Sequence, residues 1–277
     1  MSNKYILMVF VSVLWAFYSL HGQAVTKNDP NLKKIDVIEH LGEKIPLDLE
    51  FKNDRDQLVK LSHYFNKGRP VLMTLAYYRC PMLCTFVLNG LVKSASSLPY
   101  IPGVEYQMVT ISIDPTETVE LAAAKKKNHV AALKKPGVED GWDFLVGEGK
   151  NSKALAEALG FVYYYDEERN EYAHPAVSFV LTEDGTISRY LYGIEHKEQD
   201  LRLALLEASE GKIGNTLDKF ILYCYHYDPS AKGYVLFAGN VMRFGGIITV
   251  LLLVGALFIL WRKEVFKKTV TVNDKSL

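Results

Sequence analysis

The sequence predicts an α/β domain over residues 25–234, followed by a C-terminal transmembrane helix. Three observations carry this prediction. Segments of strand and helix character alternate through the middle of the chain, an uncharged stretch of 18 residues lies near the C-terminus, and an apolar leader opens the sequence. Alternating strands and helices are typical of a mostly parallel sheet with helices on both faces.

The composition is that of a folded protein with balanced charge. The chain has 277 residues, of which 32 are basic and 32 acidic, and 49% are hydrophobic. Phosphate binding requires a basic face, so this balance argues against a nucleic-acid partner. The apolar content argues against disorder, and three cysteines are too few for a disulfide-stapled miniprotein.

The N-terminus is typical of a secretory signal peptide, residues 1–24. Lys4 precedes an uncharged run at 5–20, and Gly22 and Ala24 are the small residues that signal peptidase requires. An uncleaved anchor is the alternative. The small residues and the change to polar sequence after Ala24 favour cleavage.

A second apolar segment, residues 244–261, lies between Arg243 and Arg262 and carries no charge over 18 residues. As a helix it spans about 27 Å, close to the hydrocarbon core of about 30 Å. A buried core helix is the alternative, but such helices rarely lack a polar face over this length. The basic residues that follow predict a cytoplasmic tail at 262–277. The sequence therefore predicts a single-pass inner-membrane protein, with an exported domain at 25–234 whose membrane-proximal segment begins near 212, and a transmembrane helix at 241–261.

Within the domain, residues 71–78 are the clearest strand. This nearly unbroken apolar run between Pro70 and Cys80 is typical of a central strand that is covered on both faces. A helix is expected next, at 81–97. The other expected elements are short strands at 35–38 and 45–49, a helix at 56–64, a strand at 106–113, a helix at 117–135, a strand at 142–146, a helix at 152–159, an antiparallel hairpin of strands at 176–181 and 187–192, and a helix at 197–210.

Two cysteines lie where the strand at 71–78 leads into the next helix. Pro81 suits the first helical position, which places Cys80 at the helix N-terminus, where the helix dipole favours the thiolate. Cys84 follows one turn later on the same face. The spacing permits a disulfide and equally permits one soft cation between the sulfurs. Two buried, inert cysteines are the third interpretation.

His174 comes just before Pro175 and the strand at 176–181. If the topology brings the start of this strand to the thiols, the imidazole adds a nitrogen to two sulfurs. Soft thiolates select copper(I), and imidazole suits both copper oxidation states. Zinc would prefer a fourth ligand or water.

With these residues the sequence resembles the Sco/SenC family, thioredoxin-like and membrane-anchored copper proteins that help assemble the copper A site of cytochrome c oxidase. The resemblance rests on YRCPMLC at 78–84, on VTISIDP at 109–115, and on His174 before a strand. It implies a thioredoxin-like domain in which Cys80, Cys84 and His174 bind copper, with Asp114 near the site.

The resemblance also implies a partner and a task. The protein would deliver copper to the copper-bearing subunit of cytochrome c oxidase, or reduce the cysteines there, with Cys80 and Cys84 as a redox pair. A copper donor or a thiol reductant would be a further partner. The role is that of a copper chaperone more than that of an enzyme. The alternative is a membrane-tethered thiol-disulfide oxidoreductase without copper delivery, and a peroxidase of the same fold is the third hypothesis.

Other candidates carry less chemistry. Cys224 and His226 form a Cys-x-His pair, which is either a second metal site or an incidental match. Asp114 is expected to cap the helix that begins near Thr118. Four histidines without partners at ligand spacing are expected at the surface: His40, His63, His129 and His196.

Overall fold

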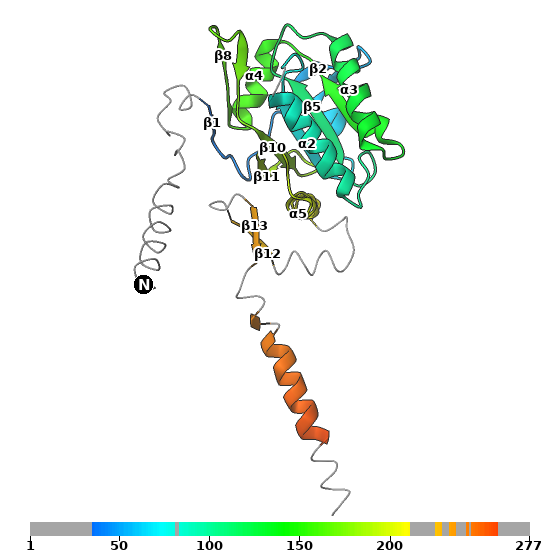
Figure 1. Ribbon diagram of the computed structural model, residues 1–277, viewed down its shortest axis with the longest axis vertical. Helices are drawn as coiled ribbons and strands as arrows, with labels where there is room; N and C mark the ends of the chain where they lie inside the picture. Colours follow the sequence, from blue (N-terminus) through cyan, green and yellow to red (C-terminus); the bar gives the residue numbers. More distant parts are fainter. Residues whose placement is uncertain are drawn as a thin grey trace, which may run out of the picture.

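The computed structural model describes residues 35–80, 83–210, 225–228, 233–236, 242–243 and 245–259. Their core is a five-stranded sheet with the strand order β11-β10-β4-β5-β6 (Figure 1). The parallel strands are β4 (Val71–Ala76), β5 (Gln107–Ser112) and β6 (Trp142–Leu145), and the antiparallel strands are β10 (Val177–Leu181) and β11 (Ile187–Tyr192). The prediction of parallel central strands with an antiparallel hairpin at one edge is confirmed.

Every residue of β4, β5, β6 and β10 is buried, which explains the continuous apolar run that the sequence shows at 71–78. Side chains of a strand alternate between the faces of its sheet. In β4, Leu72 packs into the hydrophobic cluster on one face, whereas Val71 and Met73 pack into the cluster on the other.

Helices cover both faces, as expected from the alternation. The bounds are α2 (Leu83–Ser97), α3 (Val119–Leu133), α4 (Gly149–Ala158) and α5 (Glu198–Ala208), with 3-10 turns at η2 (Leu61–Tyr64) and η3 (Val138–Asp140). Side chains from α2, α3 and α5 share one hydrophobic cluster with the sheet, and α4 and η2 contribute to the other. Four two-stranded pairs complete the described chain: β1 (Asp36–Val37) with β7 (Phe161–Val162), β2 (Glu50–Lys52) with β3 (Leu58–Lys60), β8 (Tyr164–Asp166) with β9 (Glu171–Ala173), and β12 (Tyr225–Asp228) with β13 (Gly233–Leu236).

The helix expected at 56–64 is wrong, because this segment forms β3 and then the short turn η2. The Asn53 side chain accepts hydrogen bonds from the backbone N–H groups of Arg55 and Gln57, at 3.0 and 2.9 Å, and so folds a turn in place of a first helical turn. Asp56 then adopts a positive φ of 58°. The strand expected at 45–49 is also wrong, because the strand in this region is β2, which begins only at Glu50.

The predicted transmembrane helix at 241–261 is also wrong. In this stretch the described helical residues are 242–243 and 245–259, and the longer run has 15 residues. No helix in the described part of the chain is long and apolar enough to cross a membrane. The same finding contradicts the predicted single-pass location in the inner membrane. The predicted signal peptide at 1–24 and the tail at 262–277 lie outside the described residues.

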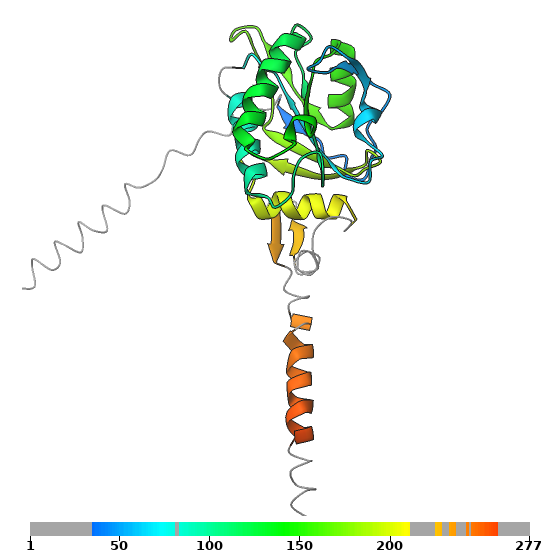
Figure 2. The same cartoon turned by 90° about the vertical axis from the view of Figure 1, so that its right-hand side faces the viewer.

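The C-terminal hairpin β12–β13 packs against α5. The backbone N–H of Tyr234 donates to Asp200 at 3.2 Å, and its hydroxyl donates to Glu207 at 2.6 Å. In Figure 2 the yellow helix α5 accordingly lies between the sheet and the orange hairpin. Helix α5 therefore has one face on the sheet and the other on the C-terminal hairpin.

A close backbone contact sets the position of α2. A Cβ atom on Gly90 would lie 1.9 Å from the carbonyl oxygen of Ile194, in the loop that follows β11. One turn further on, the Ser94 hydroxyl donates to the carbonyl oxygen of His196 at 2.7 Å. Glycine is therefore needed at position 90 for α2 to lie against this loop.

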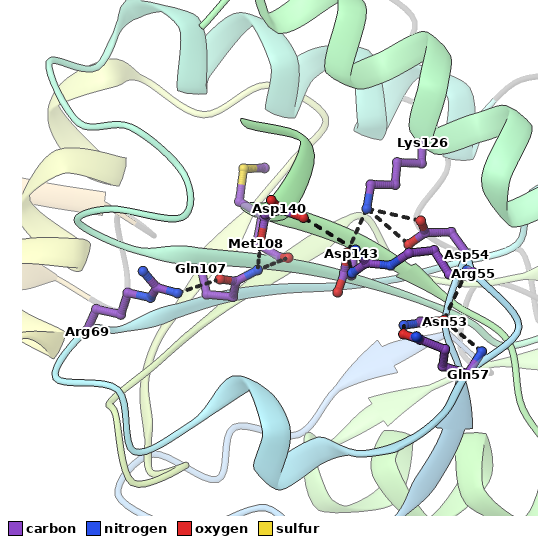
Figure 3. A network of polar contacts seen from close by, with 10 residues as sticks. All are labelled: Asn53, Asp54, Arg55, Gln57, Arg69, Gln107, Met108, Lys126, Asp140 and Asp143. Atoms are coloured by element: carbon purple, nitrogen blue, oxygen red, sulfur yellow. Dashed lines mark hydrogen bonds and ion pairs between the residues drawn. The ribbon is translucent and has the colours of Figure 1, made fainter. Parts of the chain in front are cut away.

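A polar network occupies the edge of the sheet where the parallel strands begin (Figure 3). The ammonium group of Lys126 lies 2.7 Å from Asp143, at the start of β6, and 3.0 Å from Asp54. All three side chains are nearly inaccessible to solvent. The network ties α3 and the loop after β2 to this edge.

Candidate metal centre

The two cysteines lie at the opposite edge, where β4 ends. The chain leaves β4 after Ala76 and enters α2 at Leu83, with Cys80 in the connection and Cys84 as the second helical residue. Both cysteines are reduced thiols and are buried, with 6% and 1% of their surface exposed. The backbone N–H of Cys84 donates to the Cys80 sulfur at 3.4 Å. Cys80 therefore accepts a hydrogen bond from the first turn of α2, as expected for a residue at a helix N-terminus. Pro81 and Met82 lie outside the described residues.

His174 meets Cys84. It lies between β9 and β10, is 5% exposed, and its Nε2 is 2.8 Å from the Cys84 sulfur. Because β10 runs antiparallel to β4, the start of β10 lies at the edge where β4 ends. The structure thus brings together two residues that are 90 positions apart in the sequence.

The partners of His174 determine its tautomer. Its Nδ1 lies 3.0 Å from the carbonyl oxygen of Pro175, which can only accept, so Nδ1 carries the proton. Nε2 is left with its lone pair directed at the Cys84 sulfur. This is the tautomer that a metal-binding imidazole requires, held by a hydrogen bond on the other nitrogen. The described chain has no cis peptide bond, so the bond before Pro175 is trans.

Both members of this pair are neutral. A hydrogen bond with Cys80 and burial raise the pKa of the Cys84 thiol far above its usual range. Burial lowers the pKa of His174, in spite of its hydrogen bond to Pro175. The contact is therefore a thiol that donates to a neutral imidazole.

Aromatic side chains enclose the imidazole. The ring of Tyr77 lies 6.2 Å from that of His174, edge to face, and the ring of Phe161 lies 5.9 Å away. Tyr77 also packs on Tyr172 of β9, at 5.6 Å, and its backbone N–H donates to the Cys84 sulfur at 3.5 Å. The hairpin β8–β9 thus covers one side of the site.

The donor types fit a soft metal ion, but the observed arrangement does not yet hold one. Within the described residues, no three His, Cys, Asp or Glu side chains are placed to hold a metal ion together. With metal–sulfur and metal–nitrogen bonds of roughly 2.3 and 2.0 Å, two ligands of one ion lie about 3.5 Å apart. The Cys84 sulfur and the His174 nitrogen, at 2.8 Å, must therefore separate by about 0.7 Å to admit an ion.

Asp114, the next candidate, does not have the capping role that the sequence predicts. Asp114 accepts from the backbone N–H and hydroxyl of Thr116, at 2.8 and 2.7 Å, and closes a turn. It does not cap α3, because Thr118 does so, accepting from Leu121. Cys224 and the side chain of His226 lie outside the described residues.

Two of the histidines expected at the surface are buried. His129 packs against Trp142 and Phe144, and the His196 ring shares a hydrogen bond of 3.1 Å with the Ser178 hydroxyl. Both predictions of a surface position are wrong, because the sequence does not show that the fold buries this face of α3, which carries His129, or the loop before α5, which carries His196.

One residue of the site has no place in the sequence prediction. Glu117 is 6% exposed, and its carboxylate accepts hydrogen bonds from the backbone of the connection that carries Cys80. Burial raises its pKa, against the effect of these hydrogen bonds. The sequence offers only a weak signal for this role, because an acidic residue beside a helix N-terminus is ordinary.

Comparisons with known proteins agree with this architecture. The family model SCO1/SenC matches residues 42–205. A proposed electron transfer protein from Aquifex aeolicus VF5 is 22% identical, with a TM-score of 0.55 over 62% of this chain and 96% of that one. At that identity the likeness shows the fold, which is α/β and thioredoxin-like, as the sequence predicts.

Two further structures are similar over most of their own length. Arabidopsis thaliana ScoI, crystallised with copper bound, is 19% identical, with a TM-score of 0.46 over 65% of this chain and 98% of that one. BsSco, described as a member of the Sco family of cytochrome c oxidase assembly proteins, is also 19% identical, with a TM-score of 0.45 over 65% and 99%. No curated protein matches the chain. Because the family model covers more than half of its residues, this chain belongs to the SCO1/SenC family.

Proposed function

We propose that this protein binds copper through Cys80, Cys84 and His174 and acts in the assembly of the copper A site of cytochrome c oxidase. The observation that carries the proposal is the contact of 2.8 Å between the Cys84 sulfur and the unprotonated nitrogen of His174, with Cys80 beside them. Two sulfurs and one imidazole suit copper(I) better than a hard cation. Membership of a family with copper-bound members supports the same cargo.

Capture and release follow from the state of the three side chains. The thiols lose their protons to solvent as the sulfurs bind the ion, and His174 turns its lone pair from the thiol to the ion. A site with three ligands leaves one side open for an incoming thiolate of the oxidase subunit, so the ion passes between sites of similar softness. Exchange with the disulfide of a partner, which is reduced to two thiols, converts Cys80 and Cys84 to a disulfide and removes both sulfur ligands. The redox state of Cys80 and Cys84 therefore controls the amount of copper bound.

The second candidate is a thiol-disulfide oxidoreductase that reduces the cysteines of the same target. It is favoured by the two reduced thiols one turn apart. In this reaction one sulfur attacks the target disulfide and the other resolves the mixed disulfide. The target gains two thiols, and Cys80 and Cys84 become a disulfide.

His174 separates the two functions. We expect the reduced full chain to bind one copper(I) per chain at this site and His174→Ala to weaken that binding strongly, while exchange with a disulfide substrate continues. His63→Ala, which removes an exposed imidazole, is the matched control. Copper binding is measured by competition with a chromophoric chelator, and the sulfur-to-copper charge-transfer absorption of the copper(II) form reports the sulfur ligands. Unaltered copper binding by His174→Ala refutes the ligand set.

A further inference from the structure

Glu117 connects two loops at the carboxyl edge of the sheet. It lies between β5 and α3, one residue before the helix cap Thr118. Its Oε1 accepts from the backbone N–H of Arg79 at 2.7 Å, and its Oε2 accepts from the backbone N–H of Tyr78 at 2.8 Å. These are the backbone N–H groups of the two residues that come directly before Cys80.

The same carboxylate is fixed from below. The hydroxyl of Ser112, the last residue of β5, donates to Oε2 at 2.6 Å. The guanidinium of Arg79 is directed elsewhere, since it donates to the hydroxyl and the carbonyl oxygen of Thr116 at 2.9 and 3.0 Å. The donors that hold Glu117 in place are therefore two backbone N–H groups and one hydroxyl group, and none of them is a mobile charged side chain.

A buried carboxylate is costly unless it is hydrogen-bonded, and this one has three charge-assisted hydrogen bonds. Two of them act on a connection that belongs to another strand. That connection, residues 77–80, has no regular secondary structure of its own. The interactions of Glu117 therefore restrict the backbone at the point where Cys80 begins.

We propose that Glu117 is a positioning residue, whose carboxylate holds the peptide groups before Cys80 so that the Cys80 sulfur stays beside Cys84 and His174. It acts through the backbone N–H groups of Tyr78 and Arg79. The inference deepens the proposed function and, for copper, rests on it. Its effect on the two thiols does not depend on copper.

Two substitutions remove the hydrogen bonds of Glu117 to different extents. Glu117→Ala removes all three hydrogen bonds, and Glu117→Gln keeps one carbonyl oxygen but turns an NH2 group toward a second donor. We expect copper(I) affinity to fall by about 10- to 100-fold in the alanine variant, the usual effect of removing a residue that orients a ligand, and by less in the glutamine variant. Asp143→Asn is the matched control, because it alters a buried carboxylate at the other edge of the sheet (Figure 3).

A second measurement needs no metal. The full chain is equilibrated with glutathione buffers, and the disulfide between Cys80 and Cys84 is quantified by peptide mass spectrometry, which separates these residues from Cys224. A less restricted connection disfavours ring closure, so Glu117→Ala should shift the equilibrium about 10-fold toward the dithiol, or about 30 mV. Asp143→Asn should lower stability and leave this equilibrium unchanged.

The outcomes are distinct. Reduced copper affinity and a shifted thiol equilibrium in the Glu117 variants, but not in Asp143→Asn, support the inference. An unchanged equilibrium in Glu117→Ala, or in Glu117→Gln if the alanine variant does not fold, overturns it. If the wild-type chain binds no copper but the Glu117 variants shift the equilibrium, the proposed function fails and the positioning role stands.

Discussion

The buried imidazole of His196 makes the domain sensitive to acid in a way that can be calculated. His196 is 5% exposed and joins α2 to β10, because its backbone N–H donates to Ser94 at 3.2 Å and its ring pairs with Ser178 at 3.1 Å. Burial lowers its pKa from 6.5 to about 4. Since α2 carries Cys84 and the segment before β10 carries His174, this residue supports the geometry of the candidate site.

The sign of the effect follows from proton binding. Above the unfolded pKa of 6.5 the imidazole is neutral in both states, and its contribution to stability is complete. Between pH 6.5 and about pH 4 the imidazole binds a proton only in the unfolded chain, so the free energy of unfolding decreases as the pH is lowered. Lowering the pKa from 6.5 to about 4, at about 1.36 kcal/mol per pH unit, gives a loss of about 3 kcal/mol once the pH reaches the folded pKa. That is a large fraction of the roughly 5–15 kcal/mol that stabilises a typical domain.

The assay compares urea unfolding of the wild type and His196→Gln, followed by the fluorescence of buried Trp142, between about pH 7.5 and about pH 4.5. Glutamine can still pair with Ser178 but does not titrate. The wild type should lose about 2–3 kcal/mol more than the variant over this range. His63→Gln removes an exposed imidazole and should leave most of the pH dependence in place. If the free energy of unfolding changed equally with pH in the wild type and in His196→Gln, the assignment of a buried, neutral imidazole would be refuted.

Two further predictions concern packing and charge. Gly90→Ala should lower the free energy of unfolding by about 3 kcal/mol, because the backbone carbonyl of Ile194 cannot move away as a side chain would. Helix propensity alone predicts that the same change raises this free energy by about 1 kcal/mol. Thermal unfolding, with Asn89→Ala as the control, distinguishes the two expectations by the sign of the change in stability. Lys126→Met removes the buried cation between Asp54 and Asp143, leaving Asp143 with the half-exposed Arg55 at 3.8 Å, and should cost about 3–5 kcal/mol in urea unfolding. The exposed neighbour variant Lys127→Met should cost almost nothing, and equal losses in both variants would contradict the buried network.

The sequence predicts the central strands well, for a physical reason. Residues 71–76 are buried on both faces, so they must be apolar without interruption, and that pattern is visible without knowing any neighbour. The helix expected at 56–64 fails for a reason of the same kind. Leu58 and Leu61 have helical spacing, but the Asn53 turn and the positive φ of Asp56 decide the local backbone. The strands of β8 and β9 have three residues each, too short to produce a period.

The cysteines are the part of the candidate site that a local motif reveals. That His174 contacts Cys84 depends on β10 lying antiparallel beside β4, which no stretch of sequence states. Glu117 is missed because its local context, next to the cap Thr118, already accounts for an acidic residue. The transmembrane prediction rests on a count of uncharged residues, and no helix in the described part of the chain is long and apolar enough to match it.

Three neighbouring strands each supply one segment of this edge: β4 leads to the cysteines, β5 leads to Glu117, and the segment before β10 holds His174. Transplanting the five residues from Cys80 to Cys84 onto another protein would therefore transfer the thiols without the positions of His174 and Glu117 around them. An engineer who wishes to move this chemistry must graft the strand order as well, and the smallest portable unit is the sheet itself.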